Sequence, residues 1–293
     1  MRILLFTLLP FVCFSQVSPK EDILSNNNPS IERENLATKR NALYNLEEIK
    51  VRWKKAALEN CTGVPCVVTP PAPASACGST STVLDFDGNS YVTVAIGTQC
   101  WTKTNLKVSR YNDGTLIGDS TSSTWGTATI GARTVFQSSG YPDNYGYLYN
   151  WYAATDSRKL CPDGWHVPTD SDWNKLVKFI DSGADTSMSL AQSPTAGVKL
   201  KSKATNTLLY KYIGWDIMTP ASPATDDYGF SALPAGLRDQ AGYFSDLRDR
   251  VFFWSATDSG GGPWYRKMEN NADGFYRDTF WKWGGFSVRC LKD

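Results

Sequence analysis

The chain has 293 residues, with 30 Lys and Arg against 29 Asp and Glu and one His, which gives a net charge of +1. A charge this close to zero excludes the strongly basic surface that nucleic-acid-binding domains carry, so we predict no nucleic-acid partner. The length allows one large domain with additional segments, or two modest domains. Aromatic residues make up 13% of the chain, and such side chains fill a core or form a binding face.

Residues 1–16 have the pattern of a secretory signal peptide. Arg2 precedes an apolar run that is too short to cross a bilayer core of about 30 Å. The alternative is a lipoprotein signal that is lipidated at Cys13, which the valine directly before that cysteine disfavours. No later segment is apolar enough to cross a membrane. We therefore predict a secreted or cell-surface protein without a membrane span.

The cysteines predict a disulfide framework. One of the seven, Cys13, lies within the predicted signal, and the other six are Cys61, Cys66, Cys77, Cys100, Cys161 and Cys290. An even number of cysteines in an exported chain is typical of disulfide bonding. The first two of the six enclose a turn-forming Thr-Gly-Val-Pro loop, and we expect them to pair. A zinc site would need four clustered Cys or His ligands, and the sequence has no such cluster.

Residues 17–66 are predicted to form an N-terminal helical segment. Asn28 and Pro29 have the residue types of a helix start, and apolar residues recur at helical spacing as far as Ala57. The helix is either a coiled-coil stalk, in which Lys50 would disrupt one seam position, or a helix packed on its own domain or on a partner. We favour the second, and an oligomer could form through residues 29–60. The Pro-rich residues 67–76 read as an extended linker, which places the folded domain at 77–293.

The opening of that domain reads as a β-hairpin. Two strand-prone runs between Thr82 and Ile96 flank an Asp-Gly-Asn turn. An EF-hand loop that began at Asp85 would need Glu at its twelfth position, where this chain has Ile96. The acidic residues are therefore interpreted as turn chemistry. Residues 107–146 are rich in Gly, Ser, Thr and Asn, and we expect them to form long loops.

Two helices and a short strand are predicted in the middle of the domain. Tyr149 to Leu160 has helical character, and Pro162 ends it. A short buried strand at 164–168 contains His166, the only histidine, which we interpret as a structural, hydrogen-bonded residue. A second helix begins at Thr169 with a capping box. Its apolar stripe is Trp173, Leu176, Val177 and Ile180. The rest, from Gly214, reads as short strands and Gly-rich turns.

A series of short motifs resembles a known family. The motifs are Asp85–Tyr91, Ile96–Trp101, Asn105–Lys107, Tyr111–Gly114, Gly146–Trp151, Cys161–Asp170 with Trp173, Gly229–Phe230, Leu233–Gly236, Trp254–Thr257 and Ser287–Cys290. Of these, Cys-Pro-Asp-Gly-Trp-His-Val-Pro-Thr is the most specific. Residues 77–293 thereby resemble the Fibrobacter succinogenes major paralogous domain family.

The resemblance implies a fold as well as two disulfides. The family is similar to C-type lectin-like domains and to the formylglycine-generating enzymes that share their fold. We therefore expect an α+β, C-type lectin-like domain with two helices, short antiparallel sheets and long loops, closed by disulfides and preceded by an N-terminal helix. The implied bridge is Cys161 to Cys290, and Cys77 then pairs with Cys100 by elimination.

The chemistry of the sequence favours binding over catalysis. The chain has no Gly-x-Ser-x-Gly motif, and each mature cysteine has a predicted partner. Calcium-dependent lectins carry Glu-Pro-Asn or Gln-Pro-Asp with Trp-Asn-Asp, whereas this chain has Tyr141–Asn144 and Trp254–Thr257. We predict no enzyme activity, catalytic residue, metal or cofactor. A carbohydrate-active hydrolase with an unidentified carboxylate pair is a weaker alternative.

The strongest functional signal is the aromatic and Arg-rich segment 260–285. Trp, Tyr and Arg are enriched at interface hot spots, although core packing would account for some of these aromatics. We predict an exported or cell-surface binding protein that holds a glycan or a protein ligand. The alternative is a structural subunit of an envelope or appendage assembly. The predicted contact residues are Trp264, Tyr265, Arg266, Asn270, Tyr276, Arg277, Trp281 and Trp283.

Overall fold

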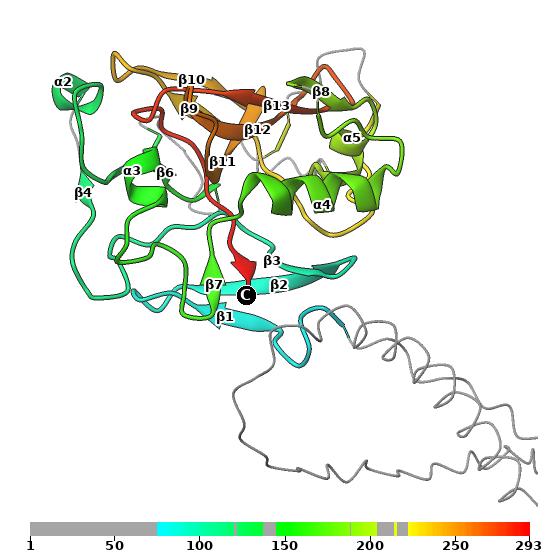
Figure 1. The fold of residues 1–293 in the computed structure, drawn as a ribbon, viewed down its shortest axis with the longest axis horizontal. Helices are drawn as coiled ribbons and strands as arrows, with labels where there is room; N and C mark the ends of the chain where they lie inside the picture. Colours follow the sequence, from blue (N-terminus) through cyan, green and yellow to red (C-terminus); the bar gives the residue numbers. More distant parts are fainter. Residues whose placement is uncertain (1–74, 120–121, 137–144, 188, 204–213, 216–221) are drawn as a thin grey trace, which may run out of the picture. The chain divides into compact units, whose positions relative to one another are not determined.

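A computed structural model describes most of the chain beyond residue 74. The described residues are 75–119, 122–136, 145–187, 189–203, 214–215 and 222–293 (Figure 1). Residues 73–293 cluster into one compact unit. The predicted signal peptide, N-terminal helix, Cys61–Cys66 pair and most of the predicted linker lie outside the described residues.

Three β-sheets make up most of the regular secondary structure in the described residues. The first is five-stranded, in the order β1 (Thr82–Leu84), β2 (Ser90–Ile96), β3 (Gln99–Thr102), β14 (Leu291–Lys292) and β7 (Trp165–His166). The second is six-stranded, in the order β10 (Phe244–Leu247), β9 (Ala235–Arg238), β11 (Arg250–Asp258), β12 (Pro263–Glu269), β13 (Phe275–Thr279) and β8 (Leu190–Ser193). The third contains β4 (Gly118–Asp119), β5 (Ala132–Thr134) and β6 (Leu148–Tyr149).

The longest described helix, α4 (Asp170–Ile180), begins where the sequence predicts. Thr169 is its N-cap, and the capping box with Asp172 is present. The predicted apolar stripe is buried against the second sheet, where the Trp173 indole nitrogen donates to the Trp254 carbonyl at 3.3 Å. Figure 1 shows α4 beside the six-stranded sheet. The other described helices are α2 (Ser122–Trp125), α3 (Trp151–Ala154) and α5 (Ala196–Leu200).

The predicted α+β, C-type lectin-like fold is wrong, because the described chain is mostly β. Fourteen strands form three sheets, and every described helix except α4 has only four or five residues. The predicted helix from Tyr149 to Leu160 shrinks to α3. Tyr149 instead pairs with Arg133 in β5 and bridges to Phe286, so long-range strand pairing overrides the local helical tendency. The predicted N-terminal helix lies outside the described residues.

Two aromatic clusters form most of the core. One surrounds Tyr149, Trp254 and Phe286 and contains all four described cysteines. The other surrounds Trp173, whose ring packs 4.8 Å from that of Trp101 and 5.7 Å from that of Phe253. Both clusters draw side chains from β11, because successive residues of a strand point to opposite faces of its sheet. This strand therefore divides the core.

Two disulfides connect segments that are distant in the sequence. Cys77 pairs with Cys100, and Cys161 pairs with Cys290, across 23 and 129 residues of sequence respectively. Both pairings agree with those predicted. The second joins the segment after α3 to the residue directly before β14, so it holds the last strand in the first sheet.

A buried cation, Arg289, lies next to the second disulfide. Its side chain is fully buried. The guanidinium donates to Asn105 Oδ1 at 2.7 Å and to three carbonyl oxygens, those of Thr102, Phe230 and Ser231. Burial lowers the pKa of Arg289 to about 9, and the charge of Asp226 opposes that shift. The N–H donors of the Arg289 guanidinium therefore connect the C-terminal segment to the end of β3 and the residues just after it, and to the segment before β9.

The two disulfides should stabilise unequally. In the chain-entropy relation, closing a loop of 129 residues stabilises by about 5 kcal/mol and closing one of 23 residues by about 3.5 kcal/mol. Replacing Cys161 and Cys290 by Ala should therefore lower the free energy of unfolding more than replacing Cys77 and Cys100 by Ala. Urea denaturation of both variants measures this. An equal or reversed order would contradict the assignment of Cys161–Cys290 as the main covalent restraint.

Loss of the Arg289 guanidinium should be among the costliest single changes. Arg289→Met leaves several buried oxygens without a donor, and we expect a loss of about 3 to 5 kcal/mol in the free energy of unfolding. The matched control is Arg250→Met, which removes a partly exposed arginine that pairs with Asp246 and Glu269 and should cost about 1 kcal/mol or less. Similar losses in urea denaturation would show that Arg289 has no special role.

Candidate ligand-binding site

The predicted contact segment forms the β12–β13 hairpin and the turn that follows it. In the hairpin, Trp264 pairs with Thr279 and Lys267 pairs with Tyr276. Asn270 lies just past the end of β12, whereas Trp281 lies just past the end of β13. These two residues are therefore at opposite ends of the hairpin. The eight predicted residues do not form one surface.

Three of the predicted contact residues are buried in this conformation. Tyr265 packs in the core, with its ring 5.2 Å from that of Phe286. Arg266 is 0% exposed and Arg277 is 8% exposed. These three side chains cannot touch a ligand unless the hairpin rearranges.

The two buried arginines share one carboxylate at the start of α4. Arg266 reaches Asp170 Oδ1 at 2.8 Å, and Arg277 reaches Asp170 Oδ2 at 2.9 Å. Arg266 also donates to Asn174 at 2.9 Å, and burial lowers its pKa to about 10. The Arg277 guanidinium stacks 3.6 Å from the centre of the Trp264 ring. Together these contacts attach the helix to the sheet.

Asn270 and Tyr276 are half-buried at the far end of the hairpin. The Asn270 amide donates to Asp249 at 2.9 Å. Lys267 lies 5.3 Å from the centre of the Tyr276 ring, and burial raises the pKa of Tyr276. Both side chains thus have local partners, and Asn270 lies at the opposite end of the hairpin from Trp281.

The remaining predicted residues lie in a cluster that we call the tryptophan surface, made of Trp151, Asp258, Trp281, Lys282 and Trp283. Trp281 is 63% exposed, and its ring lies 6.2 Å from that of Trp283 at an interplanar angle of 16°. Lys282 lies 4.8 Å from the centre of the Trp151 ring and forms a 2.9 Å ion pair with Asp258. The Asp258 carboxylate accepts hydrogen bonds from the Lys282 ammonium and from the Gly260 backbone amide, and these bonds lower the pKa of Asp258.

Sequence reasoning missed two members of this surface. Trp151 lies in the segment that the sequence predicts as a helix, and Asp258 lies just outside the predicted contact segment 260–285. The Trp151 amide donates to the Lys282 carbonyl at 2.9 Å, and its indole donates to Ser255 at 2.9 Å. These contacts bridge more than a hundred residues of sequence, and no local pattern signals them. The aromatic density of 280–283 was the only available signal.

His166 is hydrogen-bonded as predicted, but it is not in the core. Its side chain is 38% exposed, with Nδ1 2.6 Å from Asp293 and Nε2 3.3 Å from Asp172. The hydrogen bond to Asp172 is the largest effect that raises the pKa of His166, and Asp293 adds to it. Burial by itself raises the pKa of Asp172, but hydrogen bonds from His166 and Thr169 outweigh it and hold that pKa below its ordinary value.

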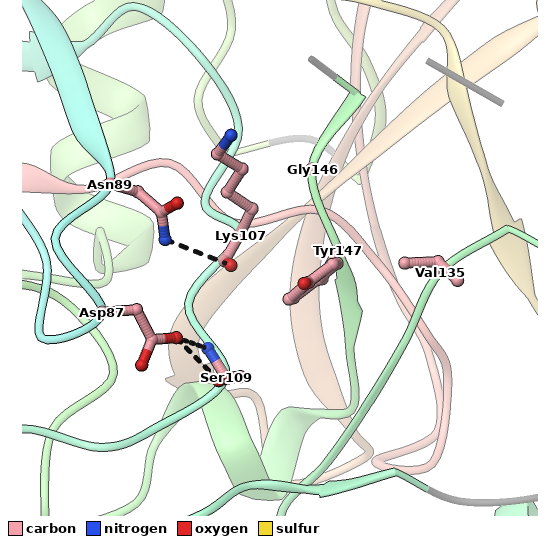
Figure 2. Close-up of a pocket in the computed structure, with 7 residues that line it drawn as sticks. All are labelled: Asp87, Asn89, Lys107, Ser109, Val135, Gly146 and Tyr147. Carbon is pink, nitrogen blue, oxygen red and sulfur yellow. Dashed lines mark hydrogen bonds between the residues drawn. The ribbon is translucent and has the colours of Figure 1, made fainter. Parts of the chain in front are cut away.

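A polar pocket of about 420 Å³ lies beside the turn between β1 and β2. As predicted, the turn is held by Asp85, whose Oδ1 accepts a hydrogen bond from the Asn89 backbone amide at 2.9 Å. No sequence pattern indicated the pocket, because its other walls come from loops. Figure 2 shows the residues that line it, which are Asp87, Asn89, Lys107, Ser109, Val135, Gly146 and Tyr147.

Neither a metal centre nor a membrane segment is found in the part of the chain that the structure describes. No group of three or more His, Cys, Asp or Glu side chains there is arranged to hold a metal ion. None of the helices in those same ranges has the length and apolar character needed to cross a bilayer.

Comparison with known proteins identifies the family. The model of the Fibrobacter succinogenes major domain matches residues 94–292. The chain belongs to this family. No curated protein and no solved structure matches it. The family assignment made from the motifs is therefore confirmed. Membership in the Fibrobacter succinogenes major domain family and the two disulfides fit an extracellular protein.

The His166 contacts of this family member predict a dependence of stability on pH. Because folding raises the pKa of His166 above its ordinary value of 6.5, the folded state binds the proton more tightly. The resulting stabilisation is complete below about pH 6.5 and is lost as the pH rises through the raised value. It should stay below about 1 kcal/mol, because the side chain is partly exposed.

Two measurements test this dependence. An NMR titration of His166, the only histidine, should give a pKa above 6.5. Urea denaturation should show that stability falls between pH 6 and pH 8.5, and that His166→Gln removes this fall. A measured pKa of 6.5 or lower would contradict the role assigned to the two carboxylates.

Proposed function

We propose that this protein is an exported or cell-surface binding protein that holds a glycan or a protein ligand on the tryptophan surface. The observation that carries the proposal is the nearly parallel pair formed by Trp281, which is exposed, and Trp283, which is half-buried. A group of aromatic rings gathered on a surface, unlike a single exposed ring, often marks a binding site. Trp is also among the residue types that dominate binding energy at interfaces.

The neighbours of the pair hold it in place before a ligand arrives. The Phe280 ring lies 5.4 Å from that of Trp283 and 5.1 Å from that of the buried Phe286. Trp151 is held by hydrogen bonds through both its amide and its indole. Rigid aromatics lose little conformational entropy on binding, so such a surface is preorganised.

The chemistry of the surface favours a glycan over a protein ligand. Flat indole faces match the apolar C–H faces of sugar rings. Lys282 and Asp258, at the edge of the surface, supply a hydrogen-bond donor and an acceptor for sugar hydroxyls. A protein partner is the second candidate, because an exposed Trp is equally suited to a protein interface.

Binding without catalysis is part of the proposal. His166 is engaged by Asp172 and Asp293, and the four described cysteines are in disulfides. The only histidine and the described cysteines are thus used elsewhere. Export through residues 1–16 is proposed with it, in agreement with a disulfide-containing extracellular protein.

Loss of the Trp281–Trp283 pair should weaken ligand binding while the fold is retained. A glycan array probed with the whole exported chain would identify a ligand. Trp281→Ala/Trp283→Ala should then weaken binding of that ligand at least tenfold, or by about 1.4 kcal/mol. Calorimetric titration measures the affinity, and circular dichroism reports the fold.

The matched control is Phe179→Ala, which removes an exposed aromatic on α4. It should bind the ligand like the unaltered chain. Unchanged affinity in the double tryptophan variant would sink the site assignment. An array without any hit, together with a large oligomeric mass in solution, would favour the structural-subunit alternative.

A further inference from the structure

The polar pocket beside the β1–β2 turn is separate from the tryptophan surface, since no residue belongs to both. Its volume, about 420 Å³, falls within the range of small-molecule sites, about 300 to 1,000 Å³. Figure 2 shows Asp87, Asn89 and Lys107 on one side of the pocket, and Tyr147 and Val135 on the other. One wall is therefore polar and the other is largely apolar.

Hydrogen bonds to neighbouring residues fix the polar wall. Asp87 Oδ2 accepts from the Ser109 amide at 2.5 Å and from its hydroxyl at 2.7 Å. The Asn89 amide nitrogen donates to Asp85 at 2.9 Å and to the Lys107 carbonyl at 3.5 Å. The Asn89 side-chain nitrogen thus already has two acceptors, whereas the side-chain oxygen can accept a hydrogen bond from a ligand hydroxyl.

The pocket is lined by one carboxylate, Asp87, and one ammonium, Lys107. Their existing contacts make the ammonium the more available of the two, which favours an anionic ligand. The Asp87 carboxylate already holds both Ser109 donors, and Arg110 Nε lies 3.8 Å from its other oxygen. By contrast, the Lys107 ammonium has no ion-pair or hydrogen-bond partner among the residues that the structure describes. A ligand ammonium would meet a carboxylate that is largely satisfied, whereas a ligand carboxylate would meet a free cation.

The opposite wall suits a sugar ring. The Arg133 guanidinium lies 4.8 Å from the centre of the Tyr147 ring and holds that ring in place. Val135, 44% exposed, continues the apolar surface. A sugar combines an apolar C–H face with a rim of hydroxyls, which matches one aromatic wall and one wall of fixed acceptors.

We propose that this pocket binds an acidic sugar residue, with its carboxylate on Lys107, a hydroxyl on the Asn89 side-chain oxygen, and its apolar face toward Tyr147. The pocket would thus recognise a uronic acid unit independently of the ligand on the tryptophan surface. A neutral hexose would lack the anionic contact. A free amino acid would lack the hydroxyls and would place its ammonium near an occupied carboxylate.

Titration of the whole chain with D-glucuronate and D-galacturonate, followed by ligand-observed NMR, tests the proposal. At least one of these should bind, and D-glucose and D-galactose should bind about tenfold more weakly or not at all, because charge-assisted hydrogen bonds are the stronger ones. Lys107→Met should weaken uronate binding about tenfold. The matched control, Lys103→Met, removes the same charge from a half-buried lysine outside the pocket lining and should leave binding unchanged.

Three results would each overturn the proposal. The first is that neither uronate binds at about 20 mM ligand. The others are that neutral and acidic sugars bind equally well, or that a folded Lys107→Met variant binds the uronate with unchanged affinity. Displacement of the uronate by inorganic phosphate or by glycine at equal concentration would show a simple anion site or an amino-acid site instead.

The Trp281→Ala/Trp283→Ala variant separates this proposal from that for the tryptophan surface. It should bind the uronate normally while it loses the array ligand. If it loses both, the two sites are not independent and the pocket assignment fails. If Lys107→Met alone loses the uronate, the pocket proposal stands whatever the array shows.

Discussion

The buried guanidinium of Arg289 is the constraint on which the rest of the structure depends. It donates to Asn105 and Thr102, near the end of β3, and to the carbonyls of Phe230 and Ser231 before β9. The guanidinium also lies over the rings of Phe230 and Phe253, so it packs against the core cluster around Trp173. Only arginine offers several donors in one rigid plane. Because Cys290 follows directly, the Cys161 disulfide and this network act on the same segment.

This use of buried charge explains why both proposed sites lie at the periphery. Arg266 and Arg277 attach α4 to the second sheet through Asp170, as Arg289 attaches the last strand to the first sheet. Arginines that suggest a binding face are thus part of the internal framework. The side chains outside this framework include the indoles of Trp281 and Trp283 after β13, which form an aromatic surface, and the groups around the β1–β2 turn, which line a polar pocket.

Local patterns predicted the features that have local causes. The capping box of Thr169 and Asp172, the apolar stripe of α4 and the Asp85–Asn89 turn each depend on residues a few positions apart. The helix predicted from Tyr149 failed because β5 and Phe286 take the backbone of that residue into strand pairing. The predicted contact set divided because Asn270 and Trp281 lie at opposite ends of the hairpin, and because Tyr265 and Arg266 are both buried. Aromatic density alone reveals neither fact.

The sequence by itself determined the family, through motifs whose order and spacing are specific, and it led to the two disulfide pairings within that family. It also determined where α4 begins, since a cap needs only neighbouring residues. Only the tertiary structure decided that the fold is mostly β, which arginines are internal, and that Trp151 joins Trp281 and Trp283. Those outcomes depend on contacts between residues far apart in the chain, and composition and spacing carry no record of which distant segments meet.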